Sequence, residues 1–109
     1  MATQAQPSAL YKNPGATSTW TDVGASTIRF NSASFISQKS NGVDNVGNVQ
    51  IRPNATTDNA ARTLLPGEIW NIDAPAGSYF TANQFQINIA ASGDGILLVY
   101  SAAIVYDGP

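Results

Sequence analysis

The stretch at residues 84–89, QFQINI, decides the fold class, because apolar and polar side chains alternate strictly along it. A period of two is typical of a β-strand with one face in a core and the other in water. The three apolar residues are expected to face the core, and the two glutamines and the asparagine to face solvent. This stretch therefore predicts a sheet with one buried side.

The next stretch completes a hairpin. Residues 92–95, SGDG, form a turn signal, and residues 96–105, ILLVYSAAIV, follow as an apolar run. Because this run is apolar on both faces, it is either a strand buried from both sides or a strand whose outer face meets a partner. It is too short to cross a bilayer, so we expect no membrane span.

Short strand-like runs separated by turn clusters continue toward the N-terminus. The turns include Asn41-Gly42 and Pro66-Gly67, and no window shows helical spacing with caps. This layout predicts an all-β chain, with a single antiparallel β-sandwich or jelly-roll-like domain over residues 17–109. The further runs are residues 17–23, 27–30, 34–38, 46–52, 69–73 and 78–82.

Residues 1–16 differ from this body, since they are polar, interrupted by Pro7 and Pro14, and lack periodicity. We expect an extended N-terminal arm that needs tethering to be ordered. A neighbouring subunit could hold it through Ala9, Leu10 and Tyr11, or the arm could pack along its own domain. The segment has no basic start followed by an apolar run, so we expect no export signal.

The amino-acid composition narrows the classes of function that the chain can have. The 109 residues allow one core, and they include no histidine, no cysteine and only 11% charged residues. The side chains that most often perform acid–base, thiol and metal chemistry are therefore missing or scarce. Five cations against seven carboxylates give a net charge of −2, which disfavours nucleic-acid binding. We expect a protein that is not an enzyme and uses no cofactor or metal.

The carboxylates do not form an evident site. Glu68 and Asp73 bracket one strand, but at five positions apart they lie on opposite faces of it. Asp94 lies in a predicted turn, where aspartate usually binds its own backbone. Asp44-Asn45 and Asp58-Asn59 are isolated pairs and lack the spacing of a calcium loop. We therefore assign no catalytic and no metal-binding residues.

The aromatic residues leave a carbohydrate-binding module open as an alternative, because indole and phenol rings stack on sugars. That alternative predicts coplanar aromatic rings exposed to solvent. Trp70 lies between apolar neighbours and is expected in the core, whereas Tyr106 follows the last strand and is expected to meet a neighbour. The other candidates are Trp20, Tyr79 and Tyr100.

Residues 49–80 resemble a pattern found in small β-sandwich structural proteins of tailed bacteriophages. A V-x-I strand leads to a polar loop and an L-x-P-G-E type of turn, and then come a strand ending near Asp73, a proline and a short aromatic strand. The apolar run at residues 96–105 matches the closing strand of that pattern. The resemblance implies a capsid decoration (cement) protein, or a head–tail or tail-fibre accessory, on the surface of a phage particle after synthesis in the host cytoplasm.

The expected partners follow from this resemblance and from the composition. They are the lattice of the major capsid protein and further copies of this chain, which would form a homotrimer at local threefold positions. Apolar anchors beside neutral hydrogen-bonding groups suit such an interface. The residues we expect to make subunit or partner contacts are Leu10, Tyr11, Leu97, Val99 and Tyr106.

Overall fold

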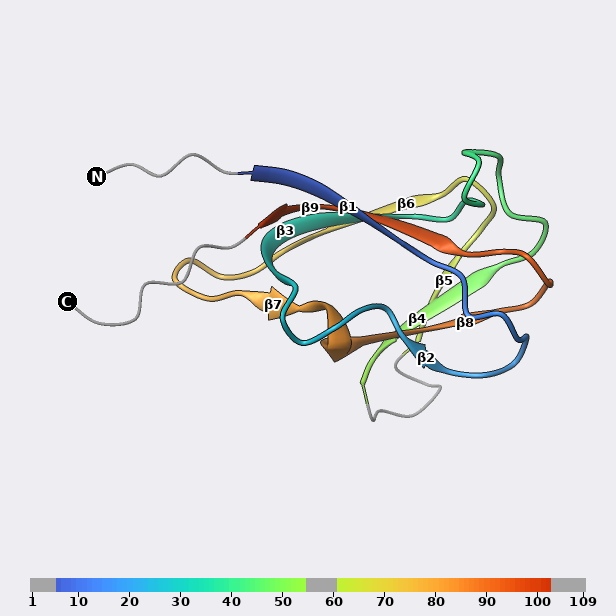
Figure 1. Cartoon of the computed structure of the whole chain (residues 1–109), viewed down its shortest axis with the longest axis horizontal. Coiled ribbons are helices and arrows are strands. Elements are labelled where there is room, and N and C mark those ends of the chain that lie inside the picture. The colour runs from blue at the N-terminus through green and yellow to red at the C-terminus, as the bar shows by residue number, and fades with distance from the viewer. Residues whose placement is uncertain (1–5, 55–60, 103–109) are drawn as a thin grey trace.

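The computed structural model describes residues 6–54 and 61–102, which form two antiparallel sheets packed face to face (Figure 1). This confirms the predicted all-β sandwich. The first sheet has the strand order β1-β9-β3-β6, with β7 paired to β3, and the second has the order β2-β8-β4-β5. The strands are β1 (Gln6–Lys12), β2 (Thr21–Asp22), β3 (Arg29–Ile36), β4 (Val49–Pro53), β5 (Arg62–Leu64), β6 (Ile69–Asp73), β7 (Phe80–Thr81), β8 (Phe85–Ile89) and β9 (Ile96–Ala102).

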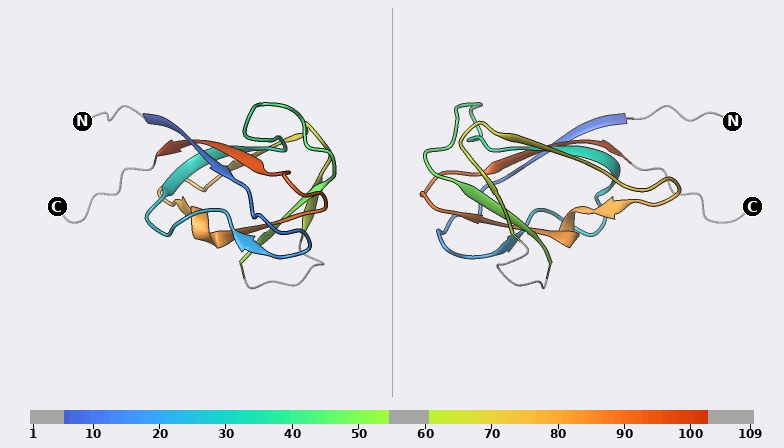
Figure 2. Two further views of the ribbon diagram at one scale, coloured as in Figure 1. Left: turned by 45° about the vertical axis from the view of Figure 1, so that its right-hand side comes forward. Right: turned by 180° about the vertical axis from the view of Figure 1, so that it is seen from behind.

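The strand order is that of a jelly roll. Setting aside the short β7, the first strand pairs with the last, β2 with β8, β3 with β6, and β4 with β5. The chain is thus one long hairpin wound so that its paired strands alternate between the two layers. Figure 2 shows the two layers turned by 45° and from behind. Of the two predicted architectures, the jelly-roll-like one describes this topology.

Residues 6–12 of the expected N-terminal arm form a strand of the sandwich. β1 pairs along its whole length with β9, from Gln6↔Ala102 to Lys12↔Ile96. Without β1, the most apolar strand of the chain would present an unpaired edge, and pairing satisfies those backbone groups. Of the two tethers considered for the arm, the structure shows packing along its own domain for this part. Residues 1–5 lie outside the described residues.

The core lies between the sheets, where the strict alternation of β8 places Phe85, Ile87 and Ile89 inward as predicted. Phe35 is at its centre, with ring centroids 5.2 Å from Phe85 and 5.5 Å from Trp70. Trp70 is half-buried against this core, as expected. Burying aromatic side chains of this size supplies most of the stabilisation available to so small a domain.

Several strand boundaries differ from the prediction; for example, the expected run at residues 17–23 contains only the two-residue β2, and that at residues 78–82 only the two-residue β7. β3 runs through the expected break at Asn31, because a shift of register between Phe30 and Ser32 absorbs the interruption as a bulge against β9. β5, where no strand was predicted, forms at the edge of the second sheet beside β4. Within the described residues, no helix is long and apolar enough to span a membrane.

A buried polar network joins the segment at residues 37–47 to the turn before β9. The Asp94 carboxylate accepts hydrogen bonds from the backbone N–H groups of Val46 (2.9 Å) and Gly47 (2.8 Å). The Asn45 side chain bonds the backbone of Gly95 in both directions, at 2.8 and 3.0 Å, and donates to the Ser37 hydroxyl. The expectation that the Asp94 side chain binds its own backbone within a turn is therefore wrong, since it is fully buried and binds a distant segment.

Candidate functional site

The outer face of the first sheet carries a row of apolar side chains that cross three strands. Leu97 on β9 pairs with Ile36 on β3, which pairs with Ile69 on β6. Val99 lies two residues along β9 on the same face. Ile69 is 54% exposed and Val99 38% exposed. We call these four residues the outer strip.

Beside the outer strip lies a shallow hollow of about 300 Å³. Small polar side chains line it, because the outward positions of β3, β6 and β9 carry serine, asparagine and aspartate. Ser34 donates a hydrogen bond to the side-chain oxygen of Asn71 across the β3–β6 pair. Asp73 is the only charged residue in the lining. The outward-facing polar residues are Ser32, Ser34, Asn71, Asp73 and Ser101.

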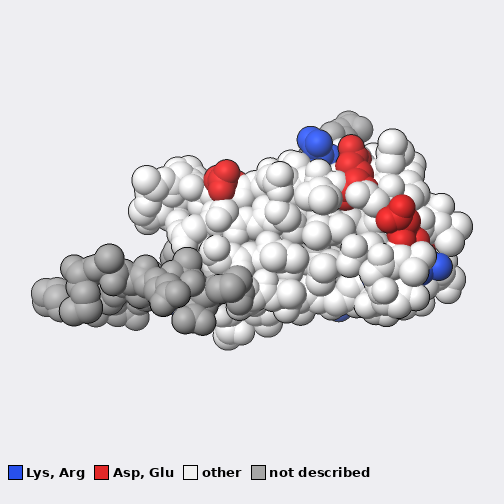
Figure 3. Space-filling model, turned by 90° about the horizontal axis from the view of Figure 1, so that it is seen from above, with Lys and Arg blue, Asp and Glu red and all other residues white. Residues whose placement is uncertain are grey.

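This face is poor in charge. Figure 3 looks onto it from above, and most of the charged side chains in that view lie toward the end away from the chain termini. Neutral hydrogen-bonding groups next to exposed apolar side chains are the composition found at the centre of protein interfaces, where charged residues are depleted. The outer face of the first sheet therefore suits contact with another protein.

The structure places the predicted contact residues in different environments. Leu97 and Val99 lie on the outer strip, opposite Tyr11 and Ala9 of β1 respectively. Leu10 points the other way and packs against the core, because successive residues of a strand face opposite sides. We therefore leave Leu10 out of the candidate contact surface. Tyr106 lies outside the described residues.

Tyr11 has a more particular position. It pairs with Leu97 on the outer side, yet its hydroxyl turns over Gly95 and is buried without a hydrogen-bond partner among the described residues. Burial raises the pKa of the Tyr11 phenol, the nearby backbone of Ser40 lowers it by a smaller amount, and the Asp94 carboxylate adds a small further rise, so the net shift is upward. This residue thus packs the end of β1 against the start of β9, and its hydroxyl is too buried to contact a partner.

More exposed apolar side chains lie at the end of the sandwich next to Ile69. Val43 is 57% exposed, Val46 71% and Leu65 57%. Two backbone hydrogen bonds tie their segments together, from Ser37 N–H to Glu68 O and from Gly67 N–H to Ser37 O. The sequence did not indicate this group because its apolar residues lie in separate turns. The turns come together only in the folded chain.

Arginine side chains cover the aromatic rings that approach the surface. The Arg52 guanidinium lies 4.0 Å from the ring centroid of Trp20, and Arg62 lies 5.2 Å from that of Trp70. Arg29 is placed in the same way over Tyr79, at 5.5 Å. These contacts are cation–π interactions. The row of bare coplanar rings that a sugar-stacking module would show is absent from the described residues.

Comparisons of the chain with protein-family models, curated proteins and solved structures found no match. In the described part of the chain, no group of three acidic residues gathers in a way that could hold a metal ion. The candidate site is therefore defined by geometry alone, as the outer strip together with the polar hollow beside it.

Proposed function

We propose that this chain is a non-enzymatic structural protein of a virion, which decorates and stabilises the assembled head of a tailed bacteriophage. The observation that carries this proposal is the outer strip, in which Val99 and Ile69 are exposed and Leu97 and Ile36 are half-buried, on a sheet face with little charge. The resemblance of residues 49–80 to phage structural proteins supplies the partner, a lattice of major capsid protein.

The sheet suits this role because its contact groups are held on rigid strands. The strip sits on the two central strands and one edge strand, so its side chains lose little further freedom when they meet a partner. Apolar anchors provide the burial, and the hydroxyl and amide groups of the neighbouring hollow provide hydrogen bonds. A protein that binds only the assembled shell stabilises it by mass action, because disassembly must also release the bound copies.

The fold agrees with this proposal by analogy alone. Jelly rolls occur in viral capsid proteins and also in lectins, so topology does not choose between them. We propose further that the protein acts as a homotrimer, because closed threefold symmetry matches the local threefold positions of a capsid lattice.

The experiment is to measure the mass of the purified protein by light scattering, and then its co-sedimentation with emptied phage heads. A stable oligomer that sediments with heads at a fixed stoichiometry is the expected result. Assembly into rings or stalks without heads would instead assign the chain to a tail or fibre. A monomer that stays in the supernatant would overturn the proposal.

A further inference from the structure

The outer face of the second sheet, opposite the proposed contact face, carries a different kind of surface. Thr63 on β5 pairs with Gln50 on β4, and Gln50 pairs with Asn88 on β8. Their side chains point outward, because their strand neighbours Leu64, Ile51 and Ile87 are buried. With strands about 4.8 Å apart, the three side chains form a polar row about 10 Å long.

The row lines a hollow of about 320 Å³, within the range of small-ligand sites at roughly 300–1,000 Å³. Every side chain of the lining is uncharged. The polar ones come from Ser18, Asn48, Gln50, Thr63 and Asn88, with Ile89 and Ala90 as the rest. A neutral lining of this kind offers no counter-charge to a phosphate, a carboxylate or an ammonium group.

The amides of the hollow are available for a ligand. Within the described part of the chain, the side chains of Asn48, Gln50, Thr63 and Asn88 make no hydrogen bonds. Their polar atoms are also not among the buried atoms that lack a partner. They are therefore open to solvent. Each amide offers two donors and one acceptor oxygen, which can engage two adjacent hydroxyl groups at once.

The next residues on the same face behave differently, since they bond one another. Arg52 Nε donates to Gln86 Oε1 at 3.0 Å, and Gln86 Nε2 donates to Asp22 Oδ1 at 3.2 Å. This network occupies the charged groups of the face. It leaves the row of Thr63, Gln50 and Asn88 as a neutral strip beside it.

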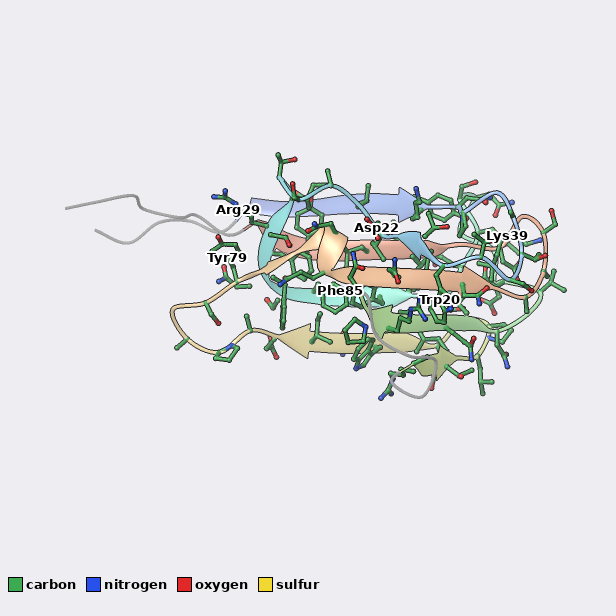
Figure 4. All side chains as sticks on the ribbon, turned by 90° about the horizontal axis from the view of Figure 1, so that it is seen from below. Trp20, Asp22, Arg29, Lys39, Tyr79 and Phe85 are labelled. Atoms are coloured by element: carbon green, nitrogen blue, oxygen red, sulfur yellow. The ribbon has the colours of Figure 1, made fainter. Side chains whose placement is uncertain are left out.

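Trp20 closes one end of the row. The N–H of Ser18 donates to Ile89 O at 3.1 Å, and Thr21 pairs with Ile87, so Trp20 lies alongside Asn88. Figure 4 views the molecule from this side and labels Trp20 and Asp22 over the second sheet. Arg52 fixes the indole at 4.0 Å, and the ring is half-buried rather than enclosed.

We infer that this hollow binds a neutral oligosaccharide. Adjacent hydroxyl groups of the sugar pair with the amides of Gln50 and Asn88, which both line the hollow. A neutral glycan fits better than an anionic one because no lining side chain is charged. The site lies on the sheet opposite the outer strip, so a copy attached to a shell by the first sheet would present it outward.

The test is a glycan array that displays neutral hexose and N-acetylhexosamine oligosaccharides beside sialylated and sulfated ones, followed by titration of the best ligand monitored by tryptophan fluorescence. Neutral glycans are expected to bind. The variants Gln50→Ala and Asn88→Ala are each expected to weaken binding at least tenfold. Asn71→Ala, an amide on the outer face of the other sheet, is the matched control and should bind as the native chain does.

Each outcome decides the inference. An array without a neutral ligand, binding confined to acidic glycans, or binding that survives both substitutions would overturn it. Circular dichroism of each variant separates loss of the site from loss of the fold. Because co-sedimentation with phage heads depends on the opposite sheet, Gln50→Ala and Asn88→Ala should leave it intact, so the two proposals fail independently.

Discussion

A Cβ atom on Gly95 would overlap the hydroxyl oxygen of Tyr11, so the two residues fit together only because position 95 has no side chain. The same Cβ would lie 2.6 Å from the Cζ atom of Tyr11 and 2.7 Å from the carbonyl oxygen of Lys12. The end of β1 is thus fitted against the start of β9. This contact adds to the backbone pairing that holds the N-terminal segment in the sheet.

Gly95→Ala should lower the free energy of unfolding by about 1–3 kcal/mol, because the backbone of β1 must move to admit the methyl group. Denaturant unfolding measures this change. Gly47→Ala is the control, since its nearest neighbour would be the Cβ of Ala90 at 3.2 Å, and it should cost less. Equal losses in the two variants would show that the Tyr11 contact is not the cause.

Tyr11→Phe should leave stability at pH 7 unchanged or raise it, by at most about 1–3 kcal/mol, because it removes a buried hydroxyl without a partner. The variant should also be less sensitive to alkali. Burial raises the pKa of Tyr11 above its ordinary value of 10.0, so the unfolded chain loses the phenol proton first and folding weakens as pH rises past that value.

The measurement for Tyr11→Phe is urea unfolding of both proteins between pH 7 and pH 11. The stability of the native chain should fall more steeply above pH 10 than that of the variant. Parallel declines, or a loss of stability in the variant at pH 7, would contradict the placement of this hydroxyl.

Asp94→Ala should destabilise the fold by about 2–4 kcal/mol, because it removes a buried carboxylate and leaves the part-buried N–H groups of Val46 and Gly47 without their acceptor. Thermal unfolding measures the loss. The exposed Asp73 provides the matched control, and Asp73→Ala should change stability by less than about 0.5 kcal/mol. A variant at position 94 as stable as this control would refute the structural role of the buried carboxylate.

Local sequence patterns predicted those strands whose core face or extent depends on neighbouring residues alone. The alternation at residues 84–89 gave the core face of β8, and residues 69–73 coincide with β6. β1 escaped prediction because Pro7 and its polar neighbours carry little strand signal of their own. Its extended form comes from the edge of β9, about 90 residues away in sequence.

The candidate sites depended still more on long-range geometry. Leu97 and Val99 were expected as contact residues of the last strand, but only the register with β3 and β6 adds Ile36 and Ile69 to the strip. Likewise, Asn88 was expected to face solvent, whereas its alignment with Gln50 and Thr63 follows from strand pairing. Asp94 misled local reasoning because its hydrogen-bond donors lie in another loop.

The most direct test of the proposed decoration role compares two lysine substitutions in co-sedimentation with emptied phage heads. Val99→Lys places a charge in the outer strip, and Gln50→Lys places the same charge on the outer face of the other sheet. Head binding should fall at least tenfold for Val99→Lys and stay at the native level for Gln50→Lys. Native binding by Val99→Lys would contradict the assignment of the first sheet as the contact face.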